Sequence, residues 1–460
     1  MQDFWCLVHD ERGEVHRIGL SRAFRGDWVR CVIIGNGVAA LEAAVAFRKL
    51  DPDSELRVIS DESELPFSRP ALMYVFMGQV RFKDTLLYDP SRLEQLNLKS
   101  MKDRVVGIET EEKTLLLHSG KTLSYDRLLI ATGSTPRKIR FEGEDDLFKL
   151  ENVCGFYHLD DLKKLDALSR HSKRVVITGG GLIGVEVAEM LQSRGLSVDF
   201  VVRETDYWRS QLPAWESRRL SERIRRHGIK LYCGDEVASV KREGQHVVEV
   251  RTKNGLELPS DIFVMSIGVE PNIAFLRESA LETQEGVVVD QGLRTSLPDV
   301  YAAGDCAELR GASGETRVEK VWYTAKAQGR IAGANLAGGE RSYQAHLWFN
   351  SAKFFDQEYQ IYGEVPVSDR QGDRHFLAEV GKGDVLFRIV ERDGRMIGMS
   401  SLGLRLRHRK AEQFIETHES WASMRLKLQE LLFEPEFSHH TFEFVETTAE
   451  ALPPEAKGDE

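Results

Sequence analysis

Two segments of this chain combine a short apolar strand pattern, a glycine-rich turn and a helical pattern. The first runs from WVRCVIIG through its turn into VAALEAAVAFRKL, and a further strand pattern, LRVIS, follows. Its turn carries Gly35 and Gly37, with the small Ala40 in the third position. A pyrophosphate binds backbone N–H groups at a helix N-terminus, and side chains in the turn would block its approach. This segment therefore predicts a dinucleotide-binding turn.

The second copy reads RVVITGGGLIGVEVAEMLQSRG and is followed by the strand pattern SVDFVVR. Gly179, Gly181 and Gly184 repeat the spacing of the first turn, and Gly195 fits the position just beyond a helix end. A single GxGxxG is a weak signal, but two copies, each between a strand and a helix, argue against chance tight turns. The chain is therefore predicted to be an α/β protein with two Rossmann-like dinucleotide-binding domains.

The residues at the end of the second strand of each unit indicate which ribose is bound. Asp61 and Glu62 stand there in the first unit, and carboxylates accept hydrogen bonds from ribose hydroxyls. In the second unit Arg203 stands there, with Arg209 further along. Guanidinium groups suit a 2′-phosphate, so we favour NADPH over NADH as the electron donor. Glu204 keeps NADH open, because it can bind the ribose if the strand ends one residue later.

Charge and cysteine content exclude several classes of protein. A net charge of −11 argues against a nucleic-acid binder. No apolar run reaches the roughly eighteen residues of a membrane span, and the N-terminus lacks the order of a signal peptide, so we expect a cytoplasmic protein. The five cysteines are scattered and never form CxxC, so neither a disulfide framework nor a metal site is expected.

Further strand patterns set the expected domains. The Asn254-Gly255 pair predicts a hairpin, and SMRLKLQELLF predicts a helix near the C-terminus. The expected parts are an N-terminal extension at 1–28 with an extra hairpin, one dinucleotide-binding domain at 29–150 and 280–340, the other at 151–279, a C-terminal α+β domain at 341–446, and a disordered acidic tail at 447–460.

Two basic stretches, RRLSERIRRHGIK from Arg218 and RLRHRK from Arg405, stand out against the acidic composition. One interpretation is a solvated helix face and a strand end. The other is a docking patch for an acidic electron carrier. The sequence leaves both open.

With these motifs in place, residues 29–340 resemble the pyridine nucleotide–disulfide oxidoreductase superfamily, whose flavoproteins have two dinucleotide-binding domains. SYDRLLIATGSTPR resembles the strand that returns to the FAD pyrophosphate, with Thr132 and Gly133 at the contact. LPDVYAAGDCAE resembles a later FAD motif that includes Gly304 and Asp305, and SIGVEPN matches the crossover back toward the flavin domain. The resemblance implies that the first unit binds FAD and the second NAD(P)H.

Within the superfamily, DESELPFSRPALMYVFMG resembles the ferredoxin, rubredoxin and nitrite reductase-like branch. This match implies that Arg69 and Pro70 lie against the flavin and its phosphates, and that Trp322 lies against the isoalloxazine ring. Glu186 matches a helix carboxylate near the nicotinamide and the flavin. Without the resemblance, Trp322 would be an ordinary core residue and Glu186 a solubilising helix residue.

Two positions depart from the family pattern. Residues 67–78 contain no cysteine, and Pro70 stands where disulfide-reducing members carry one, so thiol chemistry is not expected. Ferredoxin reductase-like relatives often place a Lys near flavin N5 that pairs with the carboxylate matching Glu186, and Tyr74 stands at that position. Cys306 follows the GD motif, where we expect a packing role.

The resemblance implies an FAD-dependent NAD(P)H oxidoreductase that passes hydride from NAD(P)H to FAD and electrons onward to an acceptor. The expected partner is a small carrier protein of the ferredoxin or rubredoxin type. No nucleic acid and no membrane span are expected, and a homodimer stays open. Two alternatives also stay open: an NAD(P)H oxidase or small-molecule reductase, and a slow-turnover flavin-bearing regulatory or interaction protein.

Overall fold

The computed structural model describes residues 5–9, 15–19, 28–139, 141, 146–311, 313–381, 383–434 and 441–450. These residues form two compact units. Unit 1 contains the residues up to Pro66 together with 87–133 and 271–344, and unit 2 contains 67–86, 134–270 and the residues from Ala345 onward. The chain leaves unit 1 after Gly133 and returns at Pro271, and the second point lies in SIGVEPN, the segment expected to cross back toward the flavin domain.

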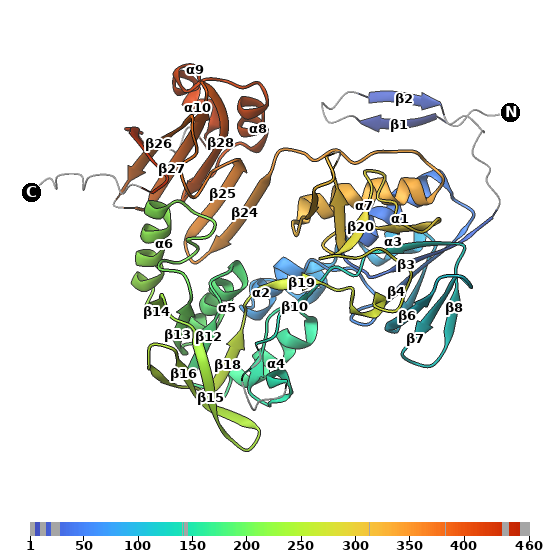
Figure 1. Cartoon of the computed structure of the whole chain (residues 1–460), viewed down its shortest axis with the longest axis horizontal. Coiled ribbons are helices and arrows are strands. Elements are labelled where there is room, and N and C mark those ends of the chain that lie inside the picture. Colours follow the sequence, from blue (N-terminus) through green and yellow to red (C-terminus); the bar gives the residue numbers. More distant parts are fainter. Residues whose placement is uncertain are drawn as a thin grey trace, which may run out of the picture. The chain divides into compact units, whose positions relative to one another are not determined.

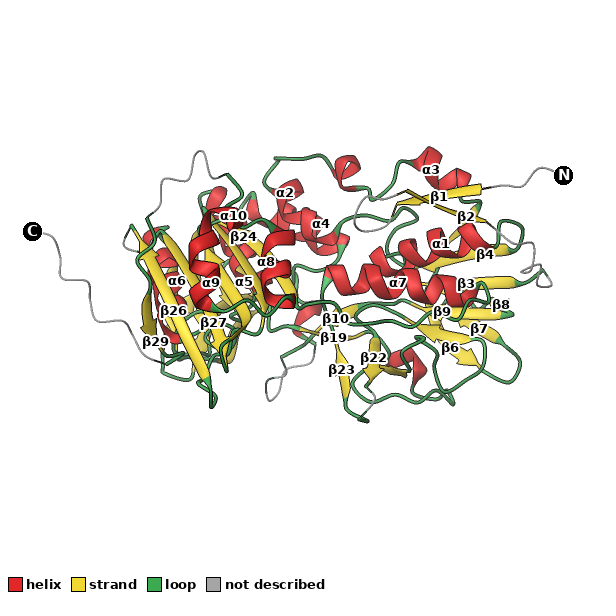
Figure 2. Ribbon diagram, turned by 90° about the horizontal axis from the view of Figure 1, so that it is seen from above, coloured by secondary structure: helices red, strands yellow, loops and turns green. Residues whose placement is uncertain are grey.

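The core of unit 1 is a parallel five-stranded sheet in the order β21-β9-β3-β4-β5. Its strands are β3 (Arg30–Ile34), β4 (Glu55–Ser60), β5 (Leu98–Lys102), β9 (Arg127–Ile130) and β21 (Val300–Ala302). The central strand β3 is almost entirely buried, as its unbroken apolar run predicts for a parallel sheet. Figures 1 and 2 show helices α1 (Val38–Leu50) and α7 (Trp322–Leu336) side by side next to this sheet.

Two glycines allow α7 to approach the backbone of α1. A Cβ atom on Gly329 would lie 2.3 Å from the carbonyl oxygen of Ala39, and one on Gly333 would lie 2.1 Å from that of Ala43. Both distances are far below van der Waals contact, so any larger residue would force the helices apart. Because α1 begins at the first glycine turn, this packing also fixes the position of that turn.

Shorter elements complete unit 1. An antiparallel sheet contains β6, β7 and β8, and a mixed sheet contains β20, β22 and β23. The N-terminal extension has the expected hairpin, since β1 pairs antiparallel with β2. The bounds are β1 (Trp5–His9), β2 (Val15–Gly19), α3 (Pro90–Gln95), β6 (Val105–Glu109), β7 (Thr114–Leu117), β8 (Thr122–Ser124), β20 (Val287–Val289), β22 (Ala307–Arg310) and β23 (Thr316–Val318).

Unit 2 contains the second parallel five-stranded sheet, in the order β11-β18-β12-β13-β14. The antiparallel sheet β15-β16-β17 follows, and its β16–β17 hairpin turns at the predicted Asn254-Gly255 pair. The bounds are β11 (Val153–Cys154), β12 (Arg174–Thr178), β13 (Ser197–Val202), β14 (Lys230–Cys233), β15 (Val237–Glu243), β16 (His246–Thr252), β17 (Glu257–Pro259), β18 (Ile262–Met265), α2 (Leu72–Phe76), α4 (Leu159–Ser169), α5 (Leu182–Ser193) and α6 (Ala214–Arg226).

The C-terminal part of unit 2 is a six-stranded antiparallel sheet in the order β24-β25-β28-β27-β26-β29. The α/β class with two Rossmann-like domains and a C-terminal α+β domain is thus confirmed. The bounds are β24 (Phe349–Phe354), β25 (Gln357–Gly363), β26 (Asp373–Val380), β27 (Val385–Arg392), β28 (Arg395–Leu402), β29 (Val445–Thr447), α8 (His408–Glu416), α9 (Trp421–Met424) and α10 (Leu428–Leu431).

Two expectations for the C-terminal region need correction. The segment SMRLKLQELLF is not one helix, because a 3-10 turn at Arg425–Lys427 separates α9 from α10. The beginning of the tail is ordered: β29 pairs with β26 as far as Thr447, and Ala449 is fully buried. Residues 451–460 lie outside the described residues. Within the part of the chain that the structure describes, we find no helix with the length and apolar character needed to cross a bilayer.

Candidate dinucleotide and redox site

The first glycine turn connects β3 to α1. Gly35 has a φ of +107°, and a Cβ there would lie 2.1 Å from the carbonyl oxygen of Ala131, so only glycine fits. Gly37 caps α1 without a side-chain hydrogen bond, and a Cβ at Gly37 would have no atom within 4 Å. Ala40 is buried against the core. The turn is therefore closed toward the protein and open at the uncapped N–H groups of α1, as an anion site requires.

The second glycine turn repeats this arrangement between β12 and α5. Gly179 has a φ of +115°, and a Cβ there would lie 2.2 Å from the carbonyl oxygen of Ser266. A Cβ on Gly184 would lie 2.3 Å from the carbonyl oxygen of Gly179. Gly181 caps α5 without a side-chain hydrogen bond and has open space at its Cβ position. Both turns therefore fit the pyrophosphate of a dinucleotide.

The carboxylates expected at the first ribose lie just beyond the end of β4. Asp61 is exposed, and its Oδ2 accepts a hydrogen bond from Nε of Arg104 at 2.8 Å. Glu62 is partly buried, and its backbone N–H donates to Oγ of Ser60 at 3.3 Å. Both residues directly follow β4, the strand that pairs with β3, and β3 leads into the first turn. Their role at the ribose stays a prediction.

At the second ribose, the structure brings Glu204 to the turn. A Cβ atom on Gly180 would lie 2.7 Å from Oε2 of Glu204, so this carboxylate lies against the glycine turn. The side chain of Arg203 is 77% exposed, and its nearest acid is Glu236 at 4.0 Å. Arg209 donates to the carbonyl oxygen of Val367 at 3.2 Å and to Glu450 at 2.6 Å. The guanidinium of Arg209 is therefore bound elsewhere within unit 2.

Three segments of unit 1 meet around the first turn. Oγ1 of Thr132 donates to the carbonyl oxygen of Asn272 at 2.8 Å, and the N–H of Asn272 donates to the carbonyl of Gly133 at 2.9 Å. The N–H of Gly304 donates to Oε1 of the buried Gln328 at 2.8 Å. A Cβ on Gly304 would come within 3.0 Å of the Ala39 side chain, which places this motif beside α1.

The two residues that follow Gly304 differ in environment. Asp305 is partly buried. Cys306 is fully buried, burial raises the pKa of its thiol, and its Sγ donates to the carbonyl oxygens of Ile130 and Ala303, both at 3.4 Å. An unreactive, hydrogen-bonded thiol supports the packing role expected for Cys306. Trp322 is partly buried at the first position of α7, a helix without a side-chain cap.

Arg69 and Pro70 form a 3-10 turn in unit 2. The guanidinium of Arg69 lies 4.5 Å from the ring centroid of Tyr157 and 5.5 Å from that of Phe67, and it donates a hydrogen bond to the carbonyl of Tyr157. These contacts hold Arg69, which precedes α2, against Tyr157 in the loop before α4. Pro70 is exposed. Contact of either residue with FAD stays a prediction.

Glu186 lies on α5, after the second glycine turn. Burial raises the pKa of its carboxyl to about 8, and the negative charge of Glu189 adds to the effect. The charge of Glu186 in turn raises the pKa values of Tyr74 and Tyr207, after the larger effect of burial on each. Tyr74, at the position where the family resemblance implies a lysine, therefore lies within electrostatic range of this carboxyl group. A pKa raised in this way favours the protonated form of this carboxyl over an ion pair.

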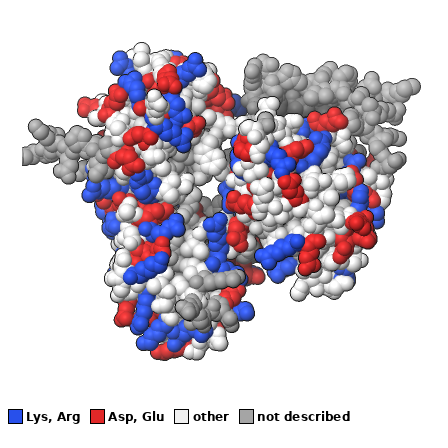
Figure 3. Space-filling model, viewed as in Figure 1, with Lys and Arg blue, Asp and Glu red and all other residues white. Residues whose placement is uncertain are grey.

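Basic side chains of α6 form ion pairs with acidic side chains of unit 2. Arg223 pairs with Asp356 and Asp384 of the C-terminal sheet region, and Arg219 pairs with Glu379 at 2.9 Å. Figure 3 shows both charge signs interspersed over the face that it presents. This arrangement supports the interpretation of a charged helix face over that of a docking patch.

The chain matches the family described as pyridine nucleotide-disulphide oxidoreductase over residues 29–329. It belongs to the pyridine nucleotide-disulphide oxidoreductase family.

Relatives of this oxidoreductase include a rubredoxin-NAD(+) reductase of Pseudomonas putida, 28% identical over 67% of this chain and 80% of the relative. A 5,5'-dehydrodivanillate O-demethylase ferredoxin reductase subunit of Sphingobium is 30% identical over 74% of this chain and 83% of that subunit. A crystal structure of a ferredoxin reductase from Rhodopseudomonas palustris has a TM-score of 0.73 and 27% identity, covering 81% of this chain and 91% of that one.

Family membership identifies the chain as an oxidoreductase that uses FAD and NAD(P)H. The glycine turns fit both groups, because each leaves open space where its second glycine lacks a Cβ and closes tightly on the protein side. The sequence predicted the spacing of these glycines. It missed Gln328, whose side chain anchors the Gly304 motif, because a glutamine on an apolar helix face gives no local signal.

Proposed function

We propose that this chain passes hydride from a reduced nicotinamide to FAD and delivers the electrons singly to a small iron–sulfur or rubredoxin-type carrier protein. The observation that carries the proposal is the combination of two dinucleotide turns with a segment, residues 67–78, that contains no thiol. Without a dithiol relay, electrons leave the flavin directly for the acceptor. The ferredoxin and rubredoxin reductases among the relatives support a carrier over an oxidase or a regulatory protein.

FAD, when bound, accepts hydride and releases single electrons, and the protein aligns and tunes the reacting groups. The turn at Gly35 and Gly37 would hold the FAD pyrophosphate, and the turn at Gly179 and Gly181 that of the coenzyme. Glu186 would meet the nicotinamide as a carboxylic acid, because its raised pKa keeps the proton on the carboxyl group. A neutral acid donates a hydrogen bond there and places no negative charge beside an incoming hydride donor.

The position of Glu204 supports NADH as the donor. Its carboxylate lies against Gly180 of the coenzyme turn, where it would accept hydrogen bonds from the ribose hydroxyls and repel a 2′-phosphate. Arg203 points into solvent and Arg209 is bound to Val367 and Glu450, so neither arginine supports the NADPH preference expected from the sequence.

Anaerobic stopped-flow mixing tests the function directly. The purified protein is mixed with NADH and, separately, with NADPH while flavin absorbance is followed, and reduced protein is then mixed with a rubredoxin or a [2Fe–2S] ferredoxin. We expect fast bleaching by NADH and fast reoxidation by a carrier, with slow reoxidation by oxygen. Slow bleaching by both nucleotides, or oxygen as the faster oxidant, would overturn the proposal.

Two expectations from the sequence stay predictions. Light scattering on the purified holoprotein would test whether the chain forms a homodimer, and cell fractionation would test the cytoplasmic location. Neither changes the assignment of the two turns.

A further inference from the structure

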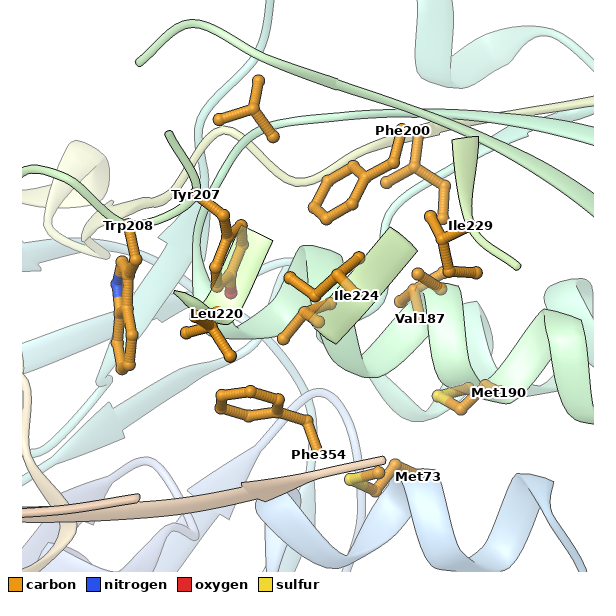
Figure 4. Packing of buried hydrophobic residues seen from close by; sticks show 14 of the residues in the cluster. Met73, Val187, Met190, Phe200, Tyr207, Trp208, Leu220, Ile224, Ile229 and Phe354 are labelled. Carbon is orange, nitrogen blue, oxygen red and sulfur yellow. The ribbon is translucent and has the colours of Figure 1, made fainter. Parts of the chain in front are cut away.

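Tyr207 reaches the coenzyme turn from the loop between β13 and α6. The residue is fully buried, and its hydroxyl donates a hydrogen bond to the carbonyl oxygen of Gly181 at 3.0 Å. Figure 4 shows Tyr207 packed among apolar side chains that include Leu220, Trp208 and Phe354. A buried phenol usually has a polar partner, and the partner here is the backbone of the phosphate-binding turn.

The carbonyl of Gly181 belongs to the same peptide group as the N–H of Leu182. Leu182 is the first residue of α5, and its N–H is one of those that have no partner within the helix. The Gly181 carbonyl already accepts the N–H of Gly184 at 3.1 Å and that of Val185 at 3.3 Å. The hydroxyl of Tyr207 adds a third donor, which fixes the plane of this peptide and polarises its N–H toward an anion.

Two buried serines of α6 hold Tyr207 in place. The N–H of Tyr207 donates to Oγ of Ser221 at 2.7 Å, and Oγ of Ser217 donates to the carbonyl of Tyr207 at 2.8 Å. Both serines are fully buried. The backbone of Tyr207 is thus anchored on both sides, so its hydroxyl has little freedom to leave Gly181.

The next residue, Trp208, has a φ of +65°, a conformation that is strained for a large side chain. Its ring lies 4.9 Å from that of Tyr359 and 6.4 Å from that of Phe354, measured between centroids. These two residues belong to β25 and β24 of the C-terminal sheet, so aromatic packing from the C-terminal domain offsets the strain. Backbone strain that surrounding contacts maintain often marks a functional position.

We infer that Tyr207 is a positioning residue for the coenzyme: its hydroxyl orients the Gly181–Leu182 peptide so that the N–H of Leu182 points at the coenzyme pyrophosphate. The inference rests on the proposed binding of the nicotinamide coenzyme at the turn from Gly179 to Gly184. The C-terminal domain contributes to the same site, because Trp208 and its aromatic neighbours hold the loop that carries Tyr207.

The test compares Tyr207→Phe with Tyr359→Phe in the FAD-loaded protein. Both changes remove one hydroxyl from the same aromatic cluster and keep the ring, but only the first removes a hydrogen bond to the turn. We expect Tyr207→Phe to raise the KM for NADH and the Kd for ADP-ribose, measured by calorimetry, by about twofold to tenfold, the value of one hydrogen bond. We expect its kcat, flavin content and melting temperature to match those of Tyr359→Phe.

Three outcomes decide the inference. Unchanged KM and Kd in Tyr207→Phe, with a wild type that binds ADP-ribose normally, would overturn it and leave the proposed function intact. If Tyr207→Phe loses kcat, flavin content and stability to the same extent as it loses coenzyme affinity, the inference also fails, because such losses indicate an ordinary structural role. If wild type binds neither NADH nor ADP-ribose, the proposed function itself fails.

A second variant guards against misfolding of Tyr207→Phe. Ser221→Ala removes the acceptor for the N–H of Tyr207 and leaves its phenol intact. We expect a smaller rise in the KM for NADH than in Tyr207→Phe, with kcat unchanged. No rise in KM would count against a role for the anchored loop.

Discussion

Burial favours the protonated, neutral form of the Glu186 carboxyl group. Its pKa of about 8 means that the folded protein keeps this proton in a pH range where the unfolded chain has already released it. Stability from this group is therefore greatest at low pH and falls as pH rises toward about 8. At about pH 8 we expect the free energy of unfolding of Glu186→Gln to exceed that of wild type by about 1–3 kcal/mol, so that the variant unfolds at a higher temperature. Near pH 4 we expect the two proteins to match.

Thermal unfolding of the two holoproteins across this pH range measures the difference. Glu189 on the same helix provides the comparison: burial raises the pKa of its carboxyl as well, but this carboxyl accepts the N–H of Phe355 at 2.6 Å. Glu189→Gln weakens that contact, so we expect a smaller gain at high pH than for Glu186→Gln. A pH-independent difference between Glu186→Gln and wild type would show that Glu186 is ionised in the folded protein.

Glu204 and Arg203 are neighbours in sequence, and we expect their substitution to affect NADH binding to very different extents. Glu204→Ala removes the carboxylate at Gly180, and we expect a loss of about 1–3 kcal/mol in NADH binding, seen as a raised KM. Arg203→Ala removes an exposed side chain, and we expect the KM for NADH to change by less than about 0.5 kcal/mol. Steady-state kinetics with both nucleotides provide the measurement. A larger effect of Arg203→Ala on NADPH, with none from Glu204→Ala, would restore the NADPH assignment.

Whether a site residue could be predicted from the sequence depends on whether its role is set locally or by distant contacts. Gly35 and Gly179 were predictable, because only glycine tolerates their positive φ and their close approach to a neighbouring carbonyl. Spacing alone did not show that Glu204 lies against Gly180 or that Arg209 binds Val367 and Glu450. Their side chains follow the loop after Val202, and the path of that loop depends on Tyr207 and Trp208 packing against distant segments.

At the scale of elements, the sequence predicted the regular strand–turn–helix units better than it predicted the short amphipathic segment near the C-terminus. The strand–turn–helix units and the end of α5 near Gly195 appear as predicted, because hydrophobic period and glycine position act locally. SMRLKLQELLF has helical spacing, yet the segment breaks at the 3-10 turn Arg425–Lys427. Its Met424 and Leu431 are fully buried in the C-terminal core, and packing there selects two short helices over one.

The packing of α1 against α7 yields a prediction about an element pair. A Cβ at Gly333 would lie 2.1 Å from the carbonyl of Ala43, so Gly333→Ala must separate the helices. We expect a loss of about 1–3 kcal/mol in unfolding free energy and weaker retention of FAD. Arg330→Ala on the same helix removes an exposed 2.8 Å contact with Glu42 and should cost less than about 1 kcal/mol. Urea unfolding and flavin content compare them, and equal losses would contradict the close-packing explanation.

At the scale of the whole molecule, the C-terminal domain is joined to the coenzyme domain within unit 2. Arg388 of β27 is fully buried and pairs with Glu216 of α6, and Nδ1 of the buried His375 lies 3.1 Å from Arg388 Nη1. The N–H of Ala214 donates to the carbonyl of Ala449 at 3.0 Å. Sequence predicted a separate C-terminal domain but not these contacts, since nothing local marks partners 172 residues apart.

The buried pair allows a test of how strongly the two domains depend on each other. Glu216→Ala would leave the Arg388 guanidinium buried without a counter-charge, which typically costs about 3–5 kcal/mol. Arg226→Ala on the same helix removes only a 3.9 Å contact with Asp384 between half-exposed side chains, and should cost less than about 1 kcal/mol.

Because α6 also carries Ser217 and Ser221, which anchor Tyr207, Glu216→Ala should raise the KM for NADH as well as lower stability. Denaturant unfolding and steady-state kinetics on both holoproteins measure the two effects. Lost stability with an unchanged KM would mean that the C-terminal domain contributes to folding and not to the coenzyme site.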